Sequence, residues 1–136
     1  MYVAGANLTV PFMAVVLRKA YGLGALAMAT GSFEETLFAI SWPTGEFAGM
    51  GLEGQIKLGR RNELAAIENI QERKARYEEM VDDAYAWSRA LNAGTVFEVD
   101  DVIDPADTRR WIVTGLRSAP PVIPRQGKKL NWIDTW

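Results

Sequence analysis

Residues 12–29 read FMAVVLRKAYGLGALAMA, which is an apolar run, a basic pair and a glycine turn in succession. An uninterrupted apolar run of this length is typical of a strand that is covered on both faces. Gly22 and Gly24 favour a tight turn, because a residue without a side chain tolerates strained backbone and close approach. The alanines and leucines that follow predict a short helix. Strand, turn and helix in this order indicate an α/β fold.

The sequence after this stretch continues with a second strand and a less regular segment. Residues 37–40 form another apolar run, and Pro43 closes it, because proline cannot take part in the middle of a strand ladder. Thr44 is a candidate N-cap for a helix within residues 44–61. The glycines of that segment indicate a helix that is bent or closely packed.

The C-terminal half predicts two capped helices. Residues 70–91 carry apolar residues on one helical face, and Asn69 precedes them at the capping position. A short strand fits residues 95–103. Asp104 predicts a helix over residues 104–116, because a carboxylate followed by proline suits a helix start. Three strands make a thin sheet, so we expect much apolar surface to remain exposed.

The composition excludes several classes of chemistry. The chain has 136 residues, with 15 Lys and Arg against 17 Asp and Glu, and it has neither cysteine nor histidine. It therefore cannot build a Ser-His-Asp or Cys-His nucleophile, a disulfide or the commonest zinc sites, and no metal site is expected. A formal charge of -2 offers no broad cationic surface, so nucleic acid is not an expected partner.

The N-terminal residues 1–17 carry no charge, yet Gly5 and Pro11 interrupt them and no basic region precedes them. This is unlike a secretory signal or a membrane span, so we expect a cytoplasmic or organelle-matrix protein without a membrane partner. Met1 is followed at once by helix-like sequence that lacks an N-cap. This indicates a chain that begins inside an element of something longer, with an ordinary frayed start as the alternative.

The glycine turn has two interpretations. Gly22-x-Gly24-x-x-Ala27 after a strand matches a dinucleotide-binding fingerprint. That fingerprint also needs an acidic residue at the end of the next strand, where residues 41–43 carry none. The second interpretation is an oxyanion site, in which the backbone N–H groups of Gly24 and Ala25 converge on one negatively charged oxygen at a helix start.

Five sequence blocks in one order give a more specific signal than any single motif. They are ANLTVP (6–11), LRKAYG (17–22), WPT (42–44), GMGLEG (49–54) and IDPADTRR (103–110). Together they resemble the carboxyltransferase subunit, or beta chain, of biotin-dependent acyl-CoA carboxylases such as propionyl-CoA carboxylase. The resemblance extends over nearly the whole chain.

The resemblance implies a fold and an assembly. It implies a crotonase/ClpP-like superhelix of strand-strand-helix units, used twice in the full subunit, of which this chain matches only the C-terminal part. Residues 1–118 would then be the C-terminal part of the carboxyltransferase C-terminal domain, and residues 119–136 an extended, proline-rich tail. The implied partners are the remainder of the subunit, a second protomer across the active site, and a biotin carboxylase or carrier subunit.

The resemblance also implies a reaction, in which a carboxyl group moves from N-carboxybiotin to the α-carbon of an acyl-CoA. Biotin would arrive on a separate protein or domain, and the CoA thioester is the substrate. No protein nucleophile, metal or histidine is needed, and this chain by itself is expected to be inactive. The family is found in the cytoplasm or the mitochondrial matrix. The implied site residues are Gly24 and Ala25 as oxyanion donors, with Tyr21, Gly22, Pro43 and Thr44 as biotin-pocket candidates.

Several points stay open at the level of sequence. Leu26-Ala27 stands where some propionyl-CoA carboxylases have a polar pair that helps choose the acyl group, so the acyl preference is undetermined. A crotonase-superfamily hydratase or isomerase, and a non-catalytic assembly module, are the alternative functions. The acidic residues Glu98, Asp100, Asp101 and Asp104 could bind a cation, but their spacing matches no cation-binding loop, and helix capping accounts for Asp104.

Overall fold

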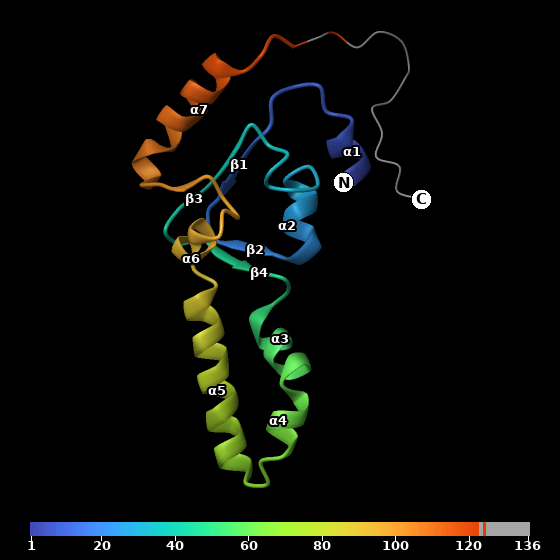
Figure 1. The fold of residues 1–136 in the computed structure, drawn as a ribbon, viewed down its shortest axis with the longest axis vertical. Coiled ribbons are helices and arrows are strands. Elements are labelled where there is room, and N and C mark those ends of the chain that lie inside the picture. The colour runs from blue at the N-terminus through green and yellow to red at the C-terminus, as the bar shows by residue number, and fades with distance from the viewer. Residues whose placement is uncertain (123, 125–136) are drawn as a thin grey trace.

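A computed structural model describes residues 1–122 and 124, and Figure 1 shows its elements. The helices are α1 (Tyr2–Ala6), α2 (Gly22–Met28), α3 (Leu52–Gly59), α4 (Arg61–Ala65), α5 (Ile70–Trp87), α6 (Ala90–Thr95) and α7 (Thr108–Ser118), with a 3-10 turn at Pro105–Asp107. The strands are β1 (Met13–Val16), β2 (Lys19–Tyr21), β3 (Phe38–Ser41), β4 (Glu46–Ala48) and β5 (Asp101–Val102). The α/β class predicted from the sequence is confirmed.

The strands form two small parallel sheets. One sheet has the order β1-β3-β5, and the other pairs β2 with β4. Met13 stands opposite Phe38 in the first sheet, and Ala20 stands opposite Phe47 in the second. Two strand-strand-helix units, β1-β2-α2 and β3-β4-α3, therefore follow one another, and each gives one strand to each sheet. This is the repeating unit that the resemblance implies.

β3 lies at the centre of the core, and all four of its residues are buried. On one face, Phe38 and Ile40 pack toward α7, where the ring of Phe38 meets that of Trp111 edge to face at 5.5 Å. On the other face, Ala39 packs with Val16 of β1 in a second apolar cluster. The strand predicted from the second apolar run is therefore confirmed, and it is the strand that is buried on both faces.

The segment after β3 differs from its prediction. A helix that starts at Thr44 is wrong, because Thr44 lies in a turn and donates its hydroxyl hydrogen to the Leu17 carbonyl oxygen at 2.6 Å. β4 follows this turn, and α3 begins only at Leu52. The sequence did not predict β2 or β4, because a strand of three residues is too short to show an alternating pattern.

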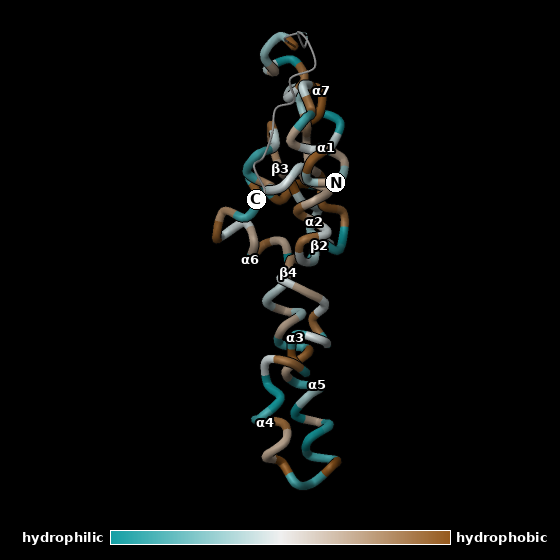
Figure 2. Tube along the Cα trace, turned by 90° about the vertical axis from the view of Figure 1, so that its right-hand side faces the viewer, coloured by the Kyte–Doolittle hydropathy of each residue, from teal (hydrophilic) through white to brown (hydrophobic). Residues whose placement is uncertain are grey.

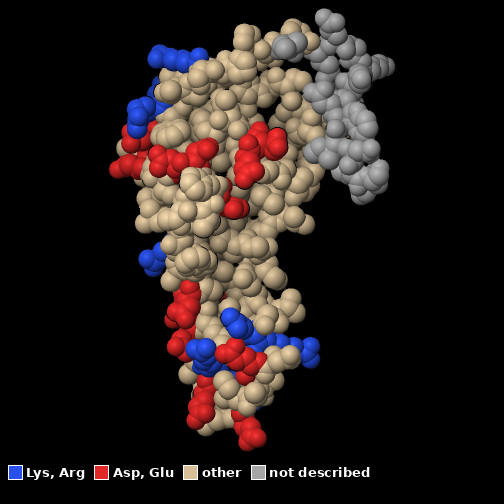
Figure 3. All heavy atoms as spheres, in the orientation of Figure 1, with Lys and Arg blue, Asp and Glu red and all other residues tan. Residues whose placement is uncertain are grey.

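α3, α4 and α5 form a helical hairpin that projects from the body (Figure 1). Asn69 caps α5 as predicted, since its side-chain oxygen accepts hydrogen bonds from the backbone N–H groups two and three residues further on. Hydrophilic residues predominate along α4 and α5 (Figure 2), and charged side chains of both signs lie on the hairpin among uncharged ones (Figure 3). Arg76 of α5 joins the two arms through an ion pair with Glu63 of α4 at 3.2 Å.

The prediction that α5 continues to residue 91 is wrong, since the helix ends at Trp87. The chain then pairs with the start of β4. The Phe47 N–H donates to the Ser88 carbonyl at 2.7 Å, and the Ala90 N–H donates to the Gly45 carbonyl at 2.8 Å. These contacts between distant segments interrupt the helix: Ser88 still has helical backbone angles, but Arg89 is extended, and α6 begins at the next residue.

The C-terminal helix begins as predicted. Asp104 accepts a hydrogen bond from the Ala106 N–H at 2.8 Å, and the 3-10 turn leads into α7. Gly115 brings α7 close to β3, because a Cβ at this position would lie 2.6 Å from a ring carbon of Phe38. Of the strand expected within residues 95–103, only β5 (Asp101–Val102) is formed.

The tail expected over residues 119–136 lies largely outside the described part of the chain, which lacks residue 123 and residues 125–136. Residues 119–122 and 124 belong to no helix or strand. The proposed division into residues 1–118 and a tail therefore remains a prediction.

Candidate functional site

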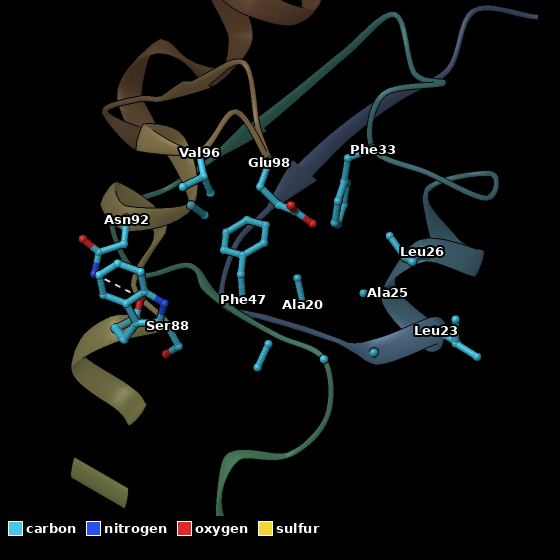
Figure 4. Close-up of a pocket in the computed structure, with 15 residues that line it drawn as sticks. Ala20, Leu23, Ala25, Leu26, Phe33, Phe47, Ser88, Asn92, Val96 and Glu98 are labelled. Carbon is cyan, nitrogen blue, oxygen red and sulfur yellow. Dashed lines mark hydrogen bonds between the residues drawn. The ribbon is translucent and has the colours of Figure 1, made fainter. Parts of the chain in front are cut away.

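An apolar cavity of about 390 Å³ lies between α2 and the segment from the end of α5 to residue 98 (Figure 4). The two-stranded sheet of β2 and β4 contributes to its lining between these walls. The lining residues are Ala20, Gly22, Leu23, Ala25, Leu26, Phe33, Phe47, Ala48, Gly49, Trp87, Ser88, Asn92, Ala93, Val96 and Glu98. A concave, mostly apolar surface with few polar groups is typical of a small-molecule site.

The aromatic and polar groups of the cavity come from distant parts of the chain. Phe33 and Phe47 meet edge to face, with their ring centroids 5.9 Å apart. The Glu98 carboxylate points into the space beside these rings (Figure 4). Ser88 and Asn92 donate side-chain hydrogen bonds to backbone carbonyl oxygens of α5, at 2.9 and 3.0 Å. These two bonds tie the wall of the cavity to α5.

The opposite wall is the beginning of α2. Tyr21 is the N-cap residue of this helix and makes no side-chain capping bond. Gly22 has φ +61°, in the left-handed region. A Cβ on Gly22 would lie 2.8 Å from the carbonyl oxygen of Gly49, so both the backbone angle and the available space require glycine here.

Gly24 and Ala25 are the third and fourth residues of α2. The Gly24 N–H precedes the first hydrogen bond of the helix, whereas the Ala25 N–H stands four residues after the Tyr21 carbonyl, its helical partner. A Cβ added to Gly24 would meet nothing within 4 Å, so this residue borders open space. Ala25 lines the cavity itself. At the start of α2, therefore, Ala25 faces the cavity and the neighbouring Gly24 borders open space.

The side chain of Tyr21 is held by β4. Its hydroxyl donates a hydrogen bond of 2.5 Å to the Glu46 carboxylate. Burial raises the pKa of the Tyr21 hydroxyl, and the hydrogen bond and the charge of Glu46 raise it further. The Lys19 ammonium lies 5.7 Å from the centre of the ring. Tyr21 is therefore a protonated hydrogen-bond donor throughout the neutral pH range.

Pro43 and Thr44 lie at the other end of the two-stranded sheet. Both are exposed in the turn after β3, and the hydroxyl of Thr44 donates to the carbonyl of Leu17, which precedes β2. Because β2 runs parallel to β4, this turn and the start of α2 are at opposite ends of the strands. The structure thus brings Tyr21 and Gly22 together with the amides of α2, and it places Pro43 and Thr44 apart from them.

The sequence did not identify most of the cavity wall, including Phe33, Phe47 and Trp87. Its only signal for Glu98 was an acidic run, and the structure separates that run by role. Asp100 accepts a hydrogen bond from the Ala39 N–H at 2.8 Å, and Asp104 caps the 3-10 turn. Within residues 1–122 and 124, no group of three or more His, Cys, Asp or Glu is placed to hold a metal ion.

Comparison with known proteins decides the family. The model of the carboxyl transferase domain family matches residues 1–120. The chain belongs to this family. Its relatives include the methylmalonyl-CoA carboxyltransferase 12S subunit of Propionibacterium freudenreichii subsp. shermanii, which is 39% identical over 117 residues, covering 85% of this chain and 22% of the relative. The resemblance to the carboxyltransferase subunits of acyl-CoA carboxylases is therefore confirmed.

Solved structures of carboxyl transferase proteins have the same fold. A single-chain, multi-domain long-chain acyl-CoA carboxylase matches 83% of this chain and 11% of its own, with 49% identity and a TM-score of 0.70. The hexameric transcarboxylase 12S core, with methylmalonyl-CoA bound, matches 94% of this chain and 25% of its own, with 33% identity and a TM-score of 0.77. These matches confirm the crotonase-like fold over part of a larger domain.

The chain spans about a fifth to a quarter of the length of the curated carboxyl transferase relatives it matches. A relative in Mycobacterium tuberculosis is a biotin-dependent acetyl-/propionyl-coenzyme A carboxylase beta6 subunit, 33% identical over 127 residues. Among the described residues, none of the helices combines the length and the apolar character that a membrane span requires.

Proposed function

We propose that the complete subunit transfers a carboxyl group from N-carboxybiotin to the α-carbon of an acyl-CoA, and that this chain supplies one oxyanion-binding turn. Membership of the carboxyl transferase family supports the reaction class. The observation that carries the assignment of the site is the start of α2, where Gly24 borders open space directly beside an apolar cavity. The region that this chain matches is 22% of the 12S relative, and the proposal includes that the 136-residue chain is inactive on its own.

The residues present fit the ureido oxygen of biotin. Gly24 has no neighbour within 4 Å of a Cβ position, so a ligand oxygen can approach the backbone of this turn. The proposed donors are the N–H groups of Gly24 and Ala25. That of Gly24 has no helical partner, whereas that of Ala25 would be shared with the Tyr21 carbonyl. Tyr21 and Gly22 are the proposed biotin-pocket residues beside these amides, whereas the other two candidates, Pro43 and Thr44, lie at the opposite end of β2 and β4.

When bound, carboxybiotin supplies the carboxyl group and, after losing it, the base that removes the α-proton of the acyl-CoA. The residues of this chain orient and stabilise rather than react. The amides at the start of α2 hold the oxygen on which negative charge develops, at the positive end of the helix. The apolar wall of Leu26, Phe33 and Phe47 excludes water, and this strengthens those hydrogen bonds.

The proposed cofactor and partners follow from the same reaction. Biotin is carried by a separate protein or domain, and a biotin carboxylase adds the carboxyl group to it. The remainder of the subunit and a second protomer complete the CoA site. The proposed location is the cytoplasm, or the mitochondrial matrix in a eukaryote.

The test is product formation by the full-length subunit with its biotin-carrying partner, bicarbonate, ATP and a series of acyl-CoA thioesters. Mass spectrometry should detect a carboxylated acyl-CoA, and avidin should abolish it by sequestering biotin. Carboxylation that persists with avidin would contradict the proposal. Water addition to an enoyl-CoA without any carboxylation would favour a hydratase instead.

A further inference from the structure

β4 contacts the residues from which α2 starts, and it does so at two points. Tyr21 is both the last residue of β2 and the N-cap of α2. It stands opposite Ala48 in the sheet, while Lys19 stands opposite Glu46. The ring of Tyr21 therefore reaches diagonally back along β4 to place its hydroxyl 2.5 Å from the Glu46 carboxylate.

The second contact is made by the backbone. The carbonyl oxygen of Gly49, just after β4, lies 2.8 Å from the position that a Cβ on Gly22 would take. One end of β4 thus holds Tyr21 and the other end supports Gly22. α2 has no side-chain cap, and a hydrogen bond of 2.9 Å from the Tyr2 hydroxyl to the Leu23 carbonyl is a third contact at its start.

We infer that Glu46 is a positioning residue for carboxyl transfer: through the Tyr21 hydroxyl it fixes α2 against the cavity, and thereby the part of the wall that Gly22, Ala25 and Leu26 contribute. The inference rests on the proposed function. Neither Glu46 nor the Tyr21 hydroxyl needs to contact a substrate in this role. A shift of the wall by a fraction of an ångström would change the orientation of bound groups without emptying the site.

The charged and titratable groups around Tyr21 indicate that its hydrogen bond to Glu46 is permanent and does not switch with pH in the neutral range. We call this bond, which holds the start of α2, the clamp. Burial and the neighbouring Glu46 raise the pKa of Tyr21, and Tyr85 and Glu53 add smaller contributions in the same direction. The Lys19 ammonium lies near the face of the ring. The phenol therefore keeps its proton and remains the donor to Glu46.

The chain contains a matched control pair. Tyr85 of α5 donates a hydrogen bond of 2.7 Å to the carboxylate of Glu53 in α3. It has the same chemistry as the Tyr21–Glu46 pair, but it joins two arms of the projecting hairpin and contributes nothing to the cavity lining. A general effect of losing a phenol–carboxylate bond should therefore be equal in the two pairs, whereas an effect through α2 should not.

The experiment measures acyl-CoA carboxylation by the full-length subunit with its biotin-carrying partner. Tyr21→Phe and Glu46→Ala should lower kcat about tenfold to a hundredfold, with KM for the acyl-CoA within about twofold. Glu46→Gln keeps an acceptor oxygen and should restore most of the rate. Tyr85→Phe should leave kcat unchanged. An unchanged kcat in Tyr21→Phe, or an equal loss in Tyr85→Phe, would overturn the inference.

Hydrogen–deuterium exchange of the peptide that contains α2 separates this inference from the proposed function. Exchange should be faster in Tyr21→Phe than in Tyr85→Phe whether or not the subunit carboxylates any acyl-CoA. If the wild-type subunit is inactive but this difference is seen, the proposed function fails and the clamp remains. Identical exchange in the two variants would refute the clamp. Tyr21→Phe keeps the ring, so it decides the question even if Glu46→Ala does not fold.

Discussion

Gly22 is the residue at which the chain changes from strand β2 to helix α2. It takes φ +61°, where residues with a side chain are strained, and the Gly49 carbonyl occupies the space of a Cβ. We predict that Gly22→Ala lowers the free energy of unfolding by about 1 to 3 kcal/mol. Gly24→Ala is the control, because its Cβ enters open space and alanine favours a helix. Urea denaturation followed by circular dichroism should separate the two variants, and equal midpoints would contradict the account.

The hydrogen bond between Tyr85 and Glu53 makes a small contribution to the stability of the fold, and this contribution depends on pH. This hydrogen bond is the largest cause of the lowered pKa of Glu53 and of the raised pKa of Tyr85. A lowered carboxyl pKa gives stability that is present above the unfolded value, about 4.3, and is lost as the pH falls through the folded pKa. A raised phenol pKa gives stability that is present below the unfolded value, about 10, and is lost as the pH rises through the folded pKa.

It follows that Tyr85→Phe should lower the melting temperature most between about pH 5 and 9. The difference from the wild type should shrink in more acidic and in more alkaline buffers. Melting curves across this range test the prediction. A difference that is the same at every pH would show that the hydroxyl contributes by packing rather than by its bond to Glu53.

Among the elements, α7 depends on close contact with β3. A Cβ on Gly115 would lie 2.6 Å from a ring carbon of Phe38, which is itself buried and packed against Trp111. We expect Gly115→Ala to destabilise the protein by about 1 to 3 kcal/mol, because the ring cannot move away within a packed core. Gly59→Ala near the end of α3 meets nothing within 4 Å and should be neutral or slightly stabilising. Thermal unfolding of both variants gives the comparison, and equal melting temperatures would argue against this packing.

The elements that the sequence predicts correctly are those defined by local chemistry. Asn69 and Asp104 cap their helices because a short polar side chain satisfies nearby amides, whatever the rest of the fold does. β3 is apparent as an unbroken apolar run. β2 and β4, in contrast, owe their existence to each other, and the end of α5 is set by pairing with β4. Those contacts join distant segments, so no local pattern contains them.

In the candidate site, too, the sequence predicts the features that local chemistry defines and misses those that depend on contacts between distant segments. Gly22 is visible in the sequence because its left-handed backbone needs glycine, and Gly24 stands out by its place in the same turn. The roles of Tyr21 and Glu46 are not visible, since their hydrogen bond depends on the register of two short strands. Phe33, Trp87 and Glu98 reach the cavity from segments that meet only in the folded chain.

At the scale of the whole molecule, the described part leaves large apolar side chains in solvent. Leu23, Trp87 and Phe97 are 73%, 72% and 85% exposed. The family relatives are about four times as long as this chain, and we expect the segments that they have in addition to cover this surface. The isolated chain should therefore bind an apolar fluorescent dye more strongly, per molecule, than the full-length subunit does. Equal or weaker binding by the isolated chain would contradict this expectation.

In the proposed reaction, the beginning of α2 stabilises the negative charge that develops during carboxyl transfer. The most direct measurement is the turnover number of the full-length subunit carrying Gly24→Val, compared with Gly59→Val, whose side chain also enters open space. We predict a loss of about a hundredfold to a thousandfold for Gly24→Val, because its side chain blocks approach to the amides, and no loss for Gly59→Val. Normal turnover by Gly24→Val would contradict the claim.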